Sequence, residues 1–102
     1  MNPTRVRLTL LAPRALEDIL VDALLAAAGP GAGFTVTPTD AAGPLFTPRG
    51  DHELVRGRSE RIAIDTLLNE SDARALIAKL RDTVRADVRW WLTPVLDEGT
   101  LP

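Results

Sequence analysis

Hydrophobic and polar residues alternate along four short stretches of the chain, a period of two that is typical of β-strands. These stretches are Arg5–Ala12, Gly33–Asp40, Ser59–Leu68 and Asp87–Val95. Pro38 lies within the second stretch. Because proline has no N–H to donate to a neighbouring strand, we expect the second stretch at an edge of the sheet.

Two further stretches repeat their apolar residues every three to four positions, as the buried face of an α-helix does. The first begins at Pro13, which suits the first turn of a helix, and ends at Gly29-Pro30-Gly31. The second begins with Asn69 or Ser71 as its cap. Its apolar face comprises Ala73, Leu76, Ile77, Leu80 and Val84.

The elements therefore follow the order β-α-β-β-α-β over a single domain, residues 1–102. This order predicts a ferredoxin-like α+β sandwich, in which a four-stranded antiparallel sheet carries both helices on one face.

Side-chain alternation also predicts which residues lie on the face of the sheet that the helices leave open. Val6, Leu8, Leu10 and Trp90 are expected beneath the helices. The open face is predicted to hold Arg7, Thr9, Leu11, Thr35, Thr37, Arg61, Ala63, Asp65, Leu67, Arg89, Trp91, Thr93 and Val95. Its apolar members suit a subunit interface, with Asp65 paired to Arg7, Arg61 or Arg89. Alternatively, Trp91 packs under the C-terminal tail and the rest of this face is solvated.

A long segment rich in glycine and proline, Ala41–Gly57 (AAGPLFTPRGDHELVRG), connects the second and third predicted strands. Connections of this length in small domains are uncommon and often functional. Loops on a rigid scaffold are also where binding residues concentrate. If the protein binds a ligand, this segment is the first place to expect it.

Composition narrows the range of functions. The formal net charge is −2 and the isoelectric point is near 5.3, so no basic surface for nucleic acid is expected. The chain has no cysteine, which excludes disulfides and thiolate chemistry. The N-terminal residues fit neither a signal peptide nor a membrane span. We therefore expect a soluble cytoplasmic protein that does not insert into membranes.

Two groups of residues could bind a ligand. Asp51, His52 and Glu53 are the one cluster of metal-ligand types. Adjacent residues seldom all reach one ion, so a metal site would need further ligands, and a solvated polar loop is the favoured explanation of this cluster. Arginines could hold an anion such as a nucleotide phosphate through paired hydrogen bonds. This second predicted site comprises Arg56, Gly57, Arg58 and Arg61.

Each group has an alternative. The arginines could instead pair with nearby acids, namely Asp40, Glu53 or Glu60. Catalysis is not expected, because the chain holds one histidine and its two serines, Ser59 and Ser71, have structural roles at a strand start and a helix start.

Four segments resemble the PII-like superfamily of small trimeric signalling proteins, relatives of nitrogen-regulatory PII and CutA proteins. They are LTLLAPRALEDILVDALL, GFTVTPTDAAG, VRGRSERIAIDTLL and RWWLTPVLDEGTL, which together extend over nearly the full chain. The resemblance implies a homotrimer whose sheets face the three-fold axis. It also implies that residues 41–57 correspond to the T-loop, the partner-binding arm of these proteins.

The resemblance further implies a non-enzymatic regulator that senses a small ligand, either a nucleotide or a divalent metal ion. The branch that this chain resembles is associated with heavy-metal efflux systems, which makes a membrane metal-efflux transporter the expected partner. A divalent-metal-binding homeostasis protein of the CutA type is the alternative. The chain lacks the modifiable loop tyrosine of PII proteins, having no tyrosine at all.

Overall fold

A computed structural model of the chain describes residues 4–28, 33–43 and 59–102. Over these residues the elements are β1 (Arg5–Pro13), the 3-10 turn η1 (Arg14–Leu16), α1 (Glu17–Ala28), β2 (Phe34–Ala41), β3 (Ser59–Asn69), α3 (Glu70–Thr83) and β4 (Arg89–Pro94). This succession confirms the predicted β-α-β-β-α-β order and the ferredoxin-like α+β fold.

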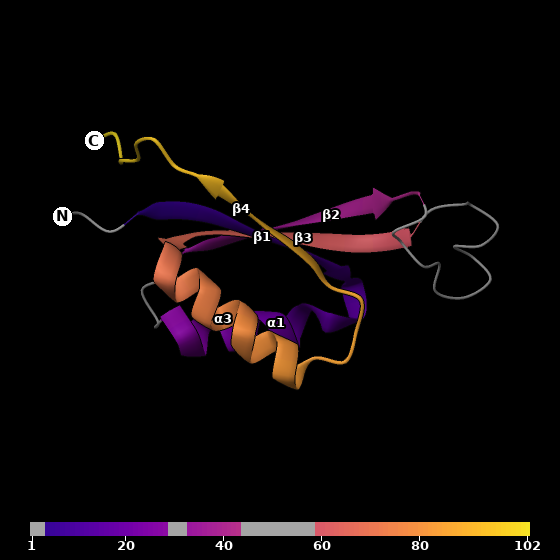
Figure 1. The fold of residues 1–102 in the computed structure, drawn as a ribbon. Helices are drawn as coiled ribbons and strands as arrows, with labels where there is room; N and C mark the ends of the chain where they lie inside the picture. The colour runs from indigo at the N-terminus through magenta and orange to yellow at the C-terminus, as the bar shows by residue number, and fades with distance from the viewer. Residues whose placement is uncertain (1–3, 29–32, 44–58) are drawn as a thin grey trace.

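The strands form one antiparallel sheet in the order β2-β3-β1-β4, with both helices packed beneath it (Figure 1). The first strand of the chain is therefore interior, paired to β3 on one side and to β4 on the other. β2 is an edge strand, as Pro38 predicted. Neither described helix is long and apolar enough to cross a membrane.

The core lies between the sheet and the helices, and its residues are those that the two periodicities predict. Strand residues Leu8, Leu10 and Ile64 are at most 1 % exposed, and helix residues Leu20 and Leu24 are fully covered. The rest of the buried cluster comprises Val6, Ala12, Ile62, Leu68, Ala73, Leu76, Ile77 and Leu80. Burying each large aliphatic side chain contributes about 1.5–3 kcal/mol to folding.

The predicted start of the first helix at Pro13 is wrong. Pro13 has an extended backbone (φ −56°, ψ 142°) and ends β1 in register with Arg61 of β3. A 3-10 turn follows, closed by the Glu17 N–H donating to the carbonyl of Arg14, and only then does α1 begin. The fixed φ of proline suits an extended residue as well as a helical one, so the sequence alone does not separate the two.

The second helix begins at Glu70, directly after Asn69, which confirms Asn69 rather than Ser71 as the cap position. The Asn69 side chain makes no capping hydrogen bond. Instead its Oδ1 accepts a hydrogen bond from the Arg5 guanidinium at 3.2 Å. The backbone N–H of Glu70 donates to the carbonyl of Thr4 at 2.8 Å. The carbonyl of Thr4, just before β1, thus accepts the hydrogen bond from the first backbone N–H of α3. In many helices a capping side chain accepts a hydrogen bond from the first turn instead.

Trp90 differs from the prediction. It lies on the helix side of the sheet, as alternation predicted, but it remains 39 % exposed instead of buried. Its strand, β4, is at the edge of the sheet, and among the described residues no further strand pairs with its outer side.

Candidate functional site

The open face of the sheet is a continuous surface made by all four strands. In register across it lie Thr35 of β2, Asp65 of β3, Thr9 of β1 and Trp91 of β4. The neighbouring row joins Thr37, Ala63, Leu11 and Arg89 in the same way. Residues directly across an antiparallel pair share one face, so the alternation of the sequence assigned these residues correctly.

The apolar residues of this face are substantially exposed. Trp91 is 41 % exposed and Leu67 40 %, while Leu11 and Ala63 are half-buried. The side chains of Trp91 and Leu67 therefore expose apolar surface to water on the same face of the sheet. A second protein surface could cover this apolar area. The alternative in which the C-terminal tail covers Trp91 does not hold for the structure, because so much of this ring remains accessible.

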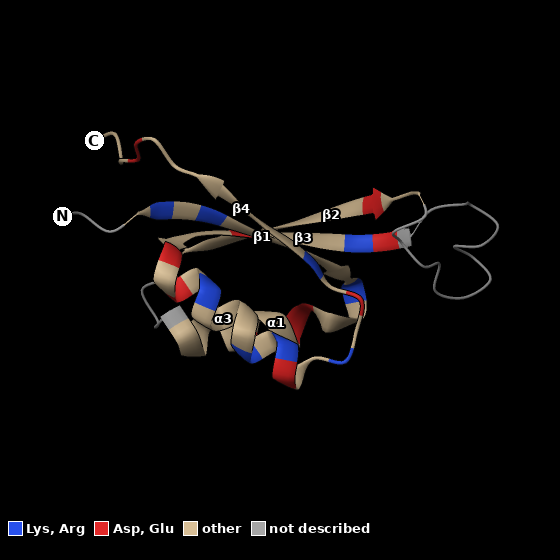
Figure 2. Ribbon diagram, viewed as in Figure 1, with Lys and Arg blue, Asp and Glu red and all other residues tan. Residues whose placement is uncertain are grey.

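A small polar network lies beside these apolar groups. Asp65 Oδ1 accepts a hydrogen bond from the Thr9 hydroxyl at 2.5 Å and lies 3.7 Å from Arg7 Nε. Of the three arginines predicted as partners of Asp65, Arg7 is therefore the one that pairs with it. Figure 2 shows the basic positions on β1 along this part of the sheet. The open face thus combines an apolar centre with an opposite-charge pair.

Arg61 follows the alternation of Ala63 and Asp65, in register with Pro13 and Thr39, but its side chain is buried, with 1 % exposed. Its guanidinium donates to the backbone carbonyl of Asp87 at 3.1 Å and to the Asp87 carboxylate at 3.3 Å. Asp87 lies in the linker before β4, on the other side of β1, so this contact joins β3 to that linker across the central strand. A charge can be buried only when it is paired in this way.

Of the predicted anion site, only Arg61 is among the described residues. Arg56, Gly57 and Arg58 lie outside them, as do Asp51, His52 and Glu53 of the predicted metal site. The Arg61 guanidinium already donates hydrogen bonds to Asp87. Ligand binding by Arg61 therefore stays a prediction. Within residues 4–28, 33–43 and 59–102, no group of three histidine, cysteine or acidic side chains could hold a metal ion.

The C-terminal tail makes a contact that sequence reasoning missed. Both carboxylate oxygens of Glu98 accept hydrogen bonds from the Arg5 guanidinium, each at 3.0 Å. The backbone N–H of Val95 also donates to the carbonyl of Arg5. The hydrogen bonds from Arg5 hold the pKa of the Glu98 carboxyl below its ordinary value. No local signal could reveal a pair separated by 93 positions.

Solved structures with the same fold were found over the full length of the chain. A DUF3240 family protein from Shewanella baltica is 21 % identical, with a TM-score of 0.74 and complete coverage of both chains. A proposed PII-like signalling protein from Thermus thermophilus is 26 % identical, with a TM-score of 0.63 over 93 % of this chain and 91 % of that one.

A third structure is CPII, a nitrogen regulatory PII-like protein from Thiomonas intermedia bound to ADP, AMP and bicarbonate. It is 15 % identical, with a TM-score of 0.66 over 98 % of each chain. The chain therefore shares the fold of PII-like signalling proteins, as its sequence segments suggested.

The remaining comparisons concern sequence. A search of curated proteins finds no match. A protein-family model, described as a protein of unknown function (DUF3240), matches residues 2–102. Since this match extends over almost the whole sequence, the chain belongs to the DUF3240 family.

Proposed function

We propose that this protein is a non-enzymatic regulator of the PII-like kind. In this proposal it assembles as a homotrimer through the open face of its sheet and responds to a small ligand bound near the base of residues 41–57. The proposal is carried by the exposed apolar centre of the open face, on a fold shared with PII-like signalling proteins.

The composition of the open face supports self-assembly. Protein interfaces are rich in aromatic and aliphatic groups at their centre and polar at their rim. Trp91 and Leu67 provide such a centre, and the Arg7–Asp65 pair lies beside it. Tryptophan is also the residue type most often found to dominate binding energy in interfaces.

Light scattering coupled to size exclusion tests the assembly. The wild type should have three times the mass of the 11.0 kDa chain, and Leu67→Glu should reduce the mass to that of a single chain. Ile19→Glu is the matched control, because Ile19 is 56 % exposed but lies on α1, away from the open face. A wild-type monomer at micromolar concentration would contradict the trimer.

The proposed ligand is anionic, with Arg56 and Arg58 as its principal contacts. Guanidinium groups bind phosphate and carboxylate through paired hydrogen bonds, and Gly57 between them leaves the backbone free to approach. CPII is bound to ADP, AMP and bicarbonate, so these three molecules are the first to try.

Thermal-shift measurements with ADP, AMP, bicarbonate and divalent metals test the ligand. A ligand at 100 times its Kd stabilises the native state by about 2.7 kcal/mol. Arg58→Gln should abolish the shift, whereas Arg74→Gln, which alters a surface arginine paired with Glu70 on α3, should retain it. Equal shifts in both variants would remove Arg58 from the proposed site.

The proposed partner is a membrane metal-efflux transporter, an inference that rests on the sequence resemblance. Cells lacking the protein should differ from wild type in their tolerance of copper, zinc, cobalt or nickel. Calorimetry with the same metals on wild type and His52→Ala distinguishes regulation from direct metal binding. Unchanged metal tolerance would contradict the transporter as partner.

A further inference from the structure

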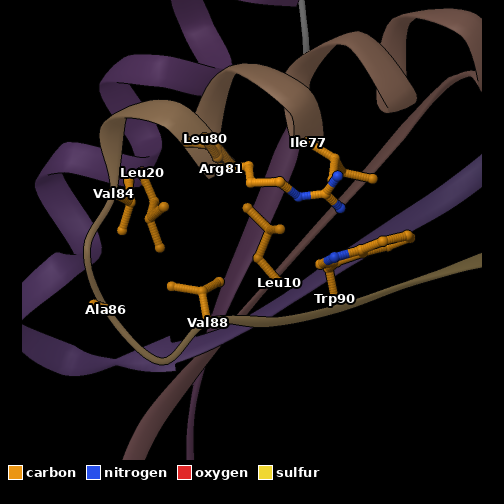
Figure 3. Close-up of a pocket in the computed structure, with 9 residues that line it drawn as sticks. All are labelled: Leu10, Leu20, Ile77, Leu80, Arg81, Val84, Ala86, Val88 and Trp90. Atoms are coloured by element: carbon orange, nitrogen blue, oxygen red, sulfur yellow. The ribbon is translucent and has the colours of Figure 1, made fainter.

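A hollow of about 190 Å³ lies on the helix side of the sheet, between the C-terminal end of α3 and β4 (Figure 3). Leu10 of β1 and Leu20 of α1 form its buried floor, and Trp90 forms one side. The remaining lining residues are Ile77, Leu80, Arg81, Val84, Ala86 and Val88.

The hollow results from the path of the linker between α3 and β4. α3 ends where the Val84 N–H donates to the carbonyl of Leu80 at 2.8 Å. The linker then turns, with the Val88 N–H donating to the carbonyl of Ala86 at 3.0 Å, before the chain enters β4. Figure 3 shows this linker curving around a space bordered by apolar side chains. No further strand lies beyond β4 within the described sheet to close the space from the side.

The mouth of the hollow carries two hydrogen-bond donors. The Arg81 side chain extends toward Trp90 (Figure 3). Within the described part of the chain, neither the Arg81 guanidinium nor the Trp90 indole N–H has a hydrogen-bond or ion-pair partner. Residues one helical turn from Arg81 are apolar or basic: Ile77, Ala78, Val84 and Arg85.

Arg74 on the same helix provides a contrast. It forms an ion pair with Glu70, four positions earlier, at 2.8 Å. A simpler explanation of Arg81 is that a cation in the last turn offsets the helix dipole. That explanation accounts for the charge but not for an adjoining apolar hollow with a half-exposed tryptophan.

We propose that this hollow binds a small amphipathic monocarboxylate. The apolar part of the ligand packs on the partly exposed Val84 and Val88, above the buried Leu10 and Leu20, while its carboxylate accepts hydrogen bonds from Arg81 and from the Trp90 indole. An apolar cavity of about 150 Å³ is known to accommodate benzene, so this hollow suits one ring or a chain of about six carbons. Arginine matches a carboxylate through its planar donors, and the partial exposure of the mouth admits the charged end.

This site goes beyond the proposed function, because it lies on the helix side of the sheet rather than on the open face. Its wall is nevertheless joined to β3. Asp87, between the lining residues Ala86 and Val88, accepts the hydrogen bonds of Arg61. A ligand that shifts the linker would therefore act directly on the start of β3, which residues 41–57 precede.

Two-dimensional NMR of the ¹⁵N-labelled full chain tests the site with sodium hexanoate and uncharged hexanamide as probes. Hexanoate should shift the Trp90 indole N–H and the backbone amides of Val84–Val88, and hexanamide should bind more weakly. Arg81→Gln should weaken hexanoate binding by about tenfold, since it removes a charge-assisted hydrogen bond but keeps most of the side chain. It should leave hexanamide binding nearly unchanged.

Arg85→Gln is the matched control, because Arg85 is an exposed arginine of the same linker that does not line the hollow. It should leave hexanoate binding within about twofold of wild type. Ala86→Leu, which replaces a methyl group at the wall by a larger isobutyl group, should reduce the binding of both probes. Absence of shifts up to ten millimolar hexanoate would overturn the proposal, as would equal weakening by Arg81→Gln and Arg85→Gln. Either result would leave the proposed trimer and its anion site unaffected.

Discussion

Arg61 shows how a single residue can have two plausible roles in a sequence and one in a structure. Beside Arg56 and Arg58 it belongs to a basic cluster that suits an anion. The fold buries it and directs its guanidinium to Asp87, a residue 26 positions away. Alternation alone cannot reveal this partner, because Asp87 precedes the last strand and is brought near Arg61 only by the central position of β1.

The Arg61–Asp87 pair should contribute measurably to stability. Asp87→Ala leaves the buried guanidinium with one fewer acceptor, and we expect a loss of about 1–3 kcal/mol in the free energy of unfolding. The Asp87 side chain is 43 % exposed, so a larger loss is not expected. Urea denaturation measures the change, with exposed Asp82→Ala as control, for which a change within about 0.5 kcal/mol is expected. Equal losses would contradict this role.

The contact of Glu98 with Arg5 should make the position of the tail depend on pH. Hydrogen bonds from Arg5 lower the pKa of Glu98, so the folded protein favours the charged carboxylate. The contribution of the pair is complete above the ordinary glutamate pKa and is lost as pH falls through the lowered value. NMR of the Glu98 side chain, followed from neutral to strongly acidic pH, should show this titration midpoint below that of an unpaired glutamate.

Glu98→Gln is the control for that titration. The amide cannot ionise, so the Arg5 Nε–H signal, whose proton is donated to the Glu98 carboxylate in the wild type, should lose most of its pH dependence in this range. A Glu98 midpoint at the ordinary value would show that the contact with Arg5 does not persist in solution.

At the scale of elements, the period-two and period-3.6 patterns predicted every described strand and both helices. The predictions were wrong at the ends of elements, because contacts between elements determine where a strand or helix begins and ends. Pro13 extends β1 because it pairs with Arg61, and Glu70 starts α3 with its N–H bonded to Thr4. Trp90 was predicted as buried because periodicity assigns a face but does not report whether a strand is at an edge.

The arrangement of these elements predicts which side-chain truncations reduce stability most. Leu8 of β1 is fully buried between the sheet and the helices, so Leu8→Ala should lower the free energy of unfolding by about 2–5 kcal/mol. Leu96→Ala makes the same chemical change at a fully exposed position and should alter stability by less than about 0.5 kcal/mol. Chemical denaturation followed by circular dichroism measures both, and similar losses would contradict the assignment of the core.

At the scale of the whole molecule, composition and element order were sufficient to predict the fold. Side-chain alternation also predicted that Trp91 and Leu67 lie on the open face. The predicted site at Arg56, Gly57 and Arg58 lies beyond the described residues and stays a prediction. The hollow beside Arg81 was not foreseen. It depends on the path of residues 84–88 and on an edge strand, and neither has a periodic signature in the sequence.

The strand order β2-β3-β1-β4 also has a consequence for how the chain folds. β1 is the first of the four strands in the sequence, but its two neighbours in the sheet, β3 and β4, come much later. The native sheet is therefore complete only when residues 89–94 have paired with β1. Contacts between such distant segments require costly loop closure, which slows folding relative to helical bundles. Stopped-flow refolding followed by the fluorescence of Trp90 and Trp91 should therefore show the main phase in milliseconds or longer. A phase completed in microseconds would mean that the chain reaches its fold without first closing these long loops.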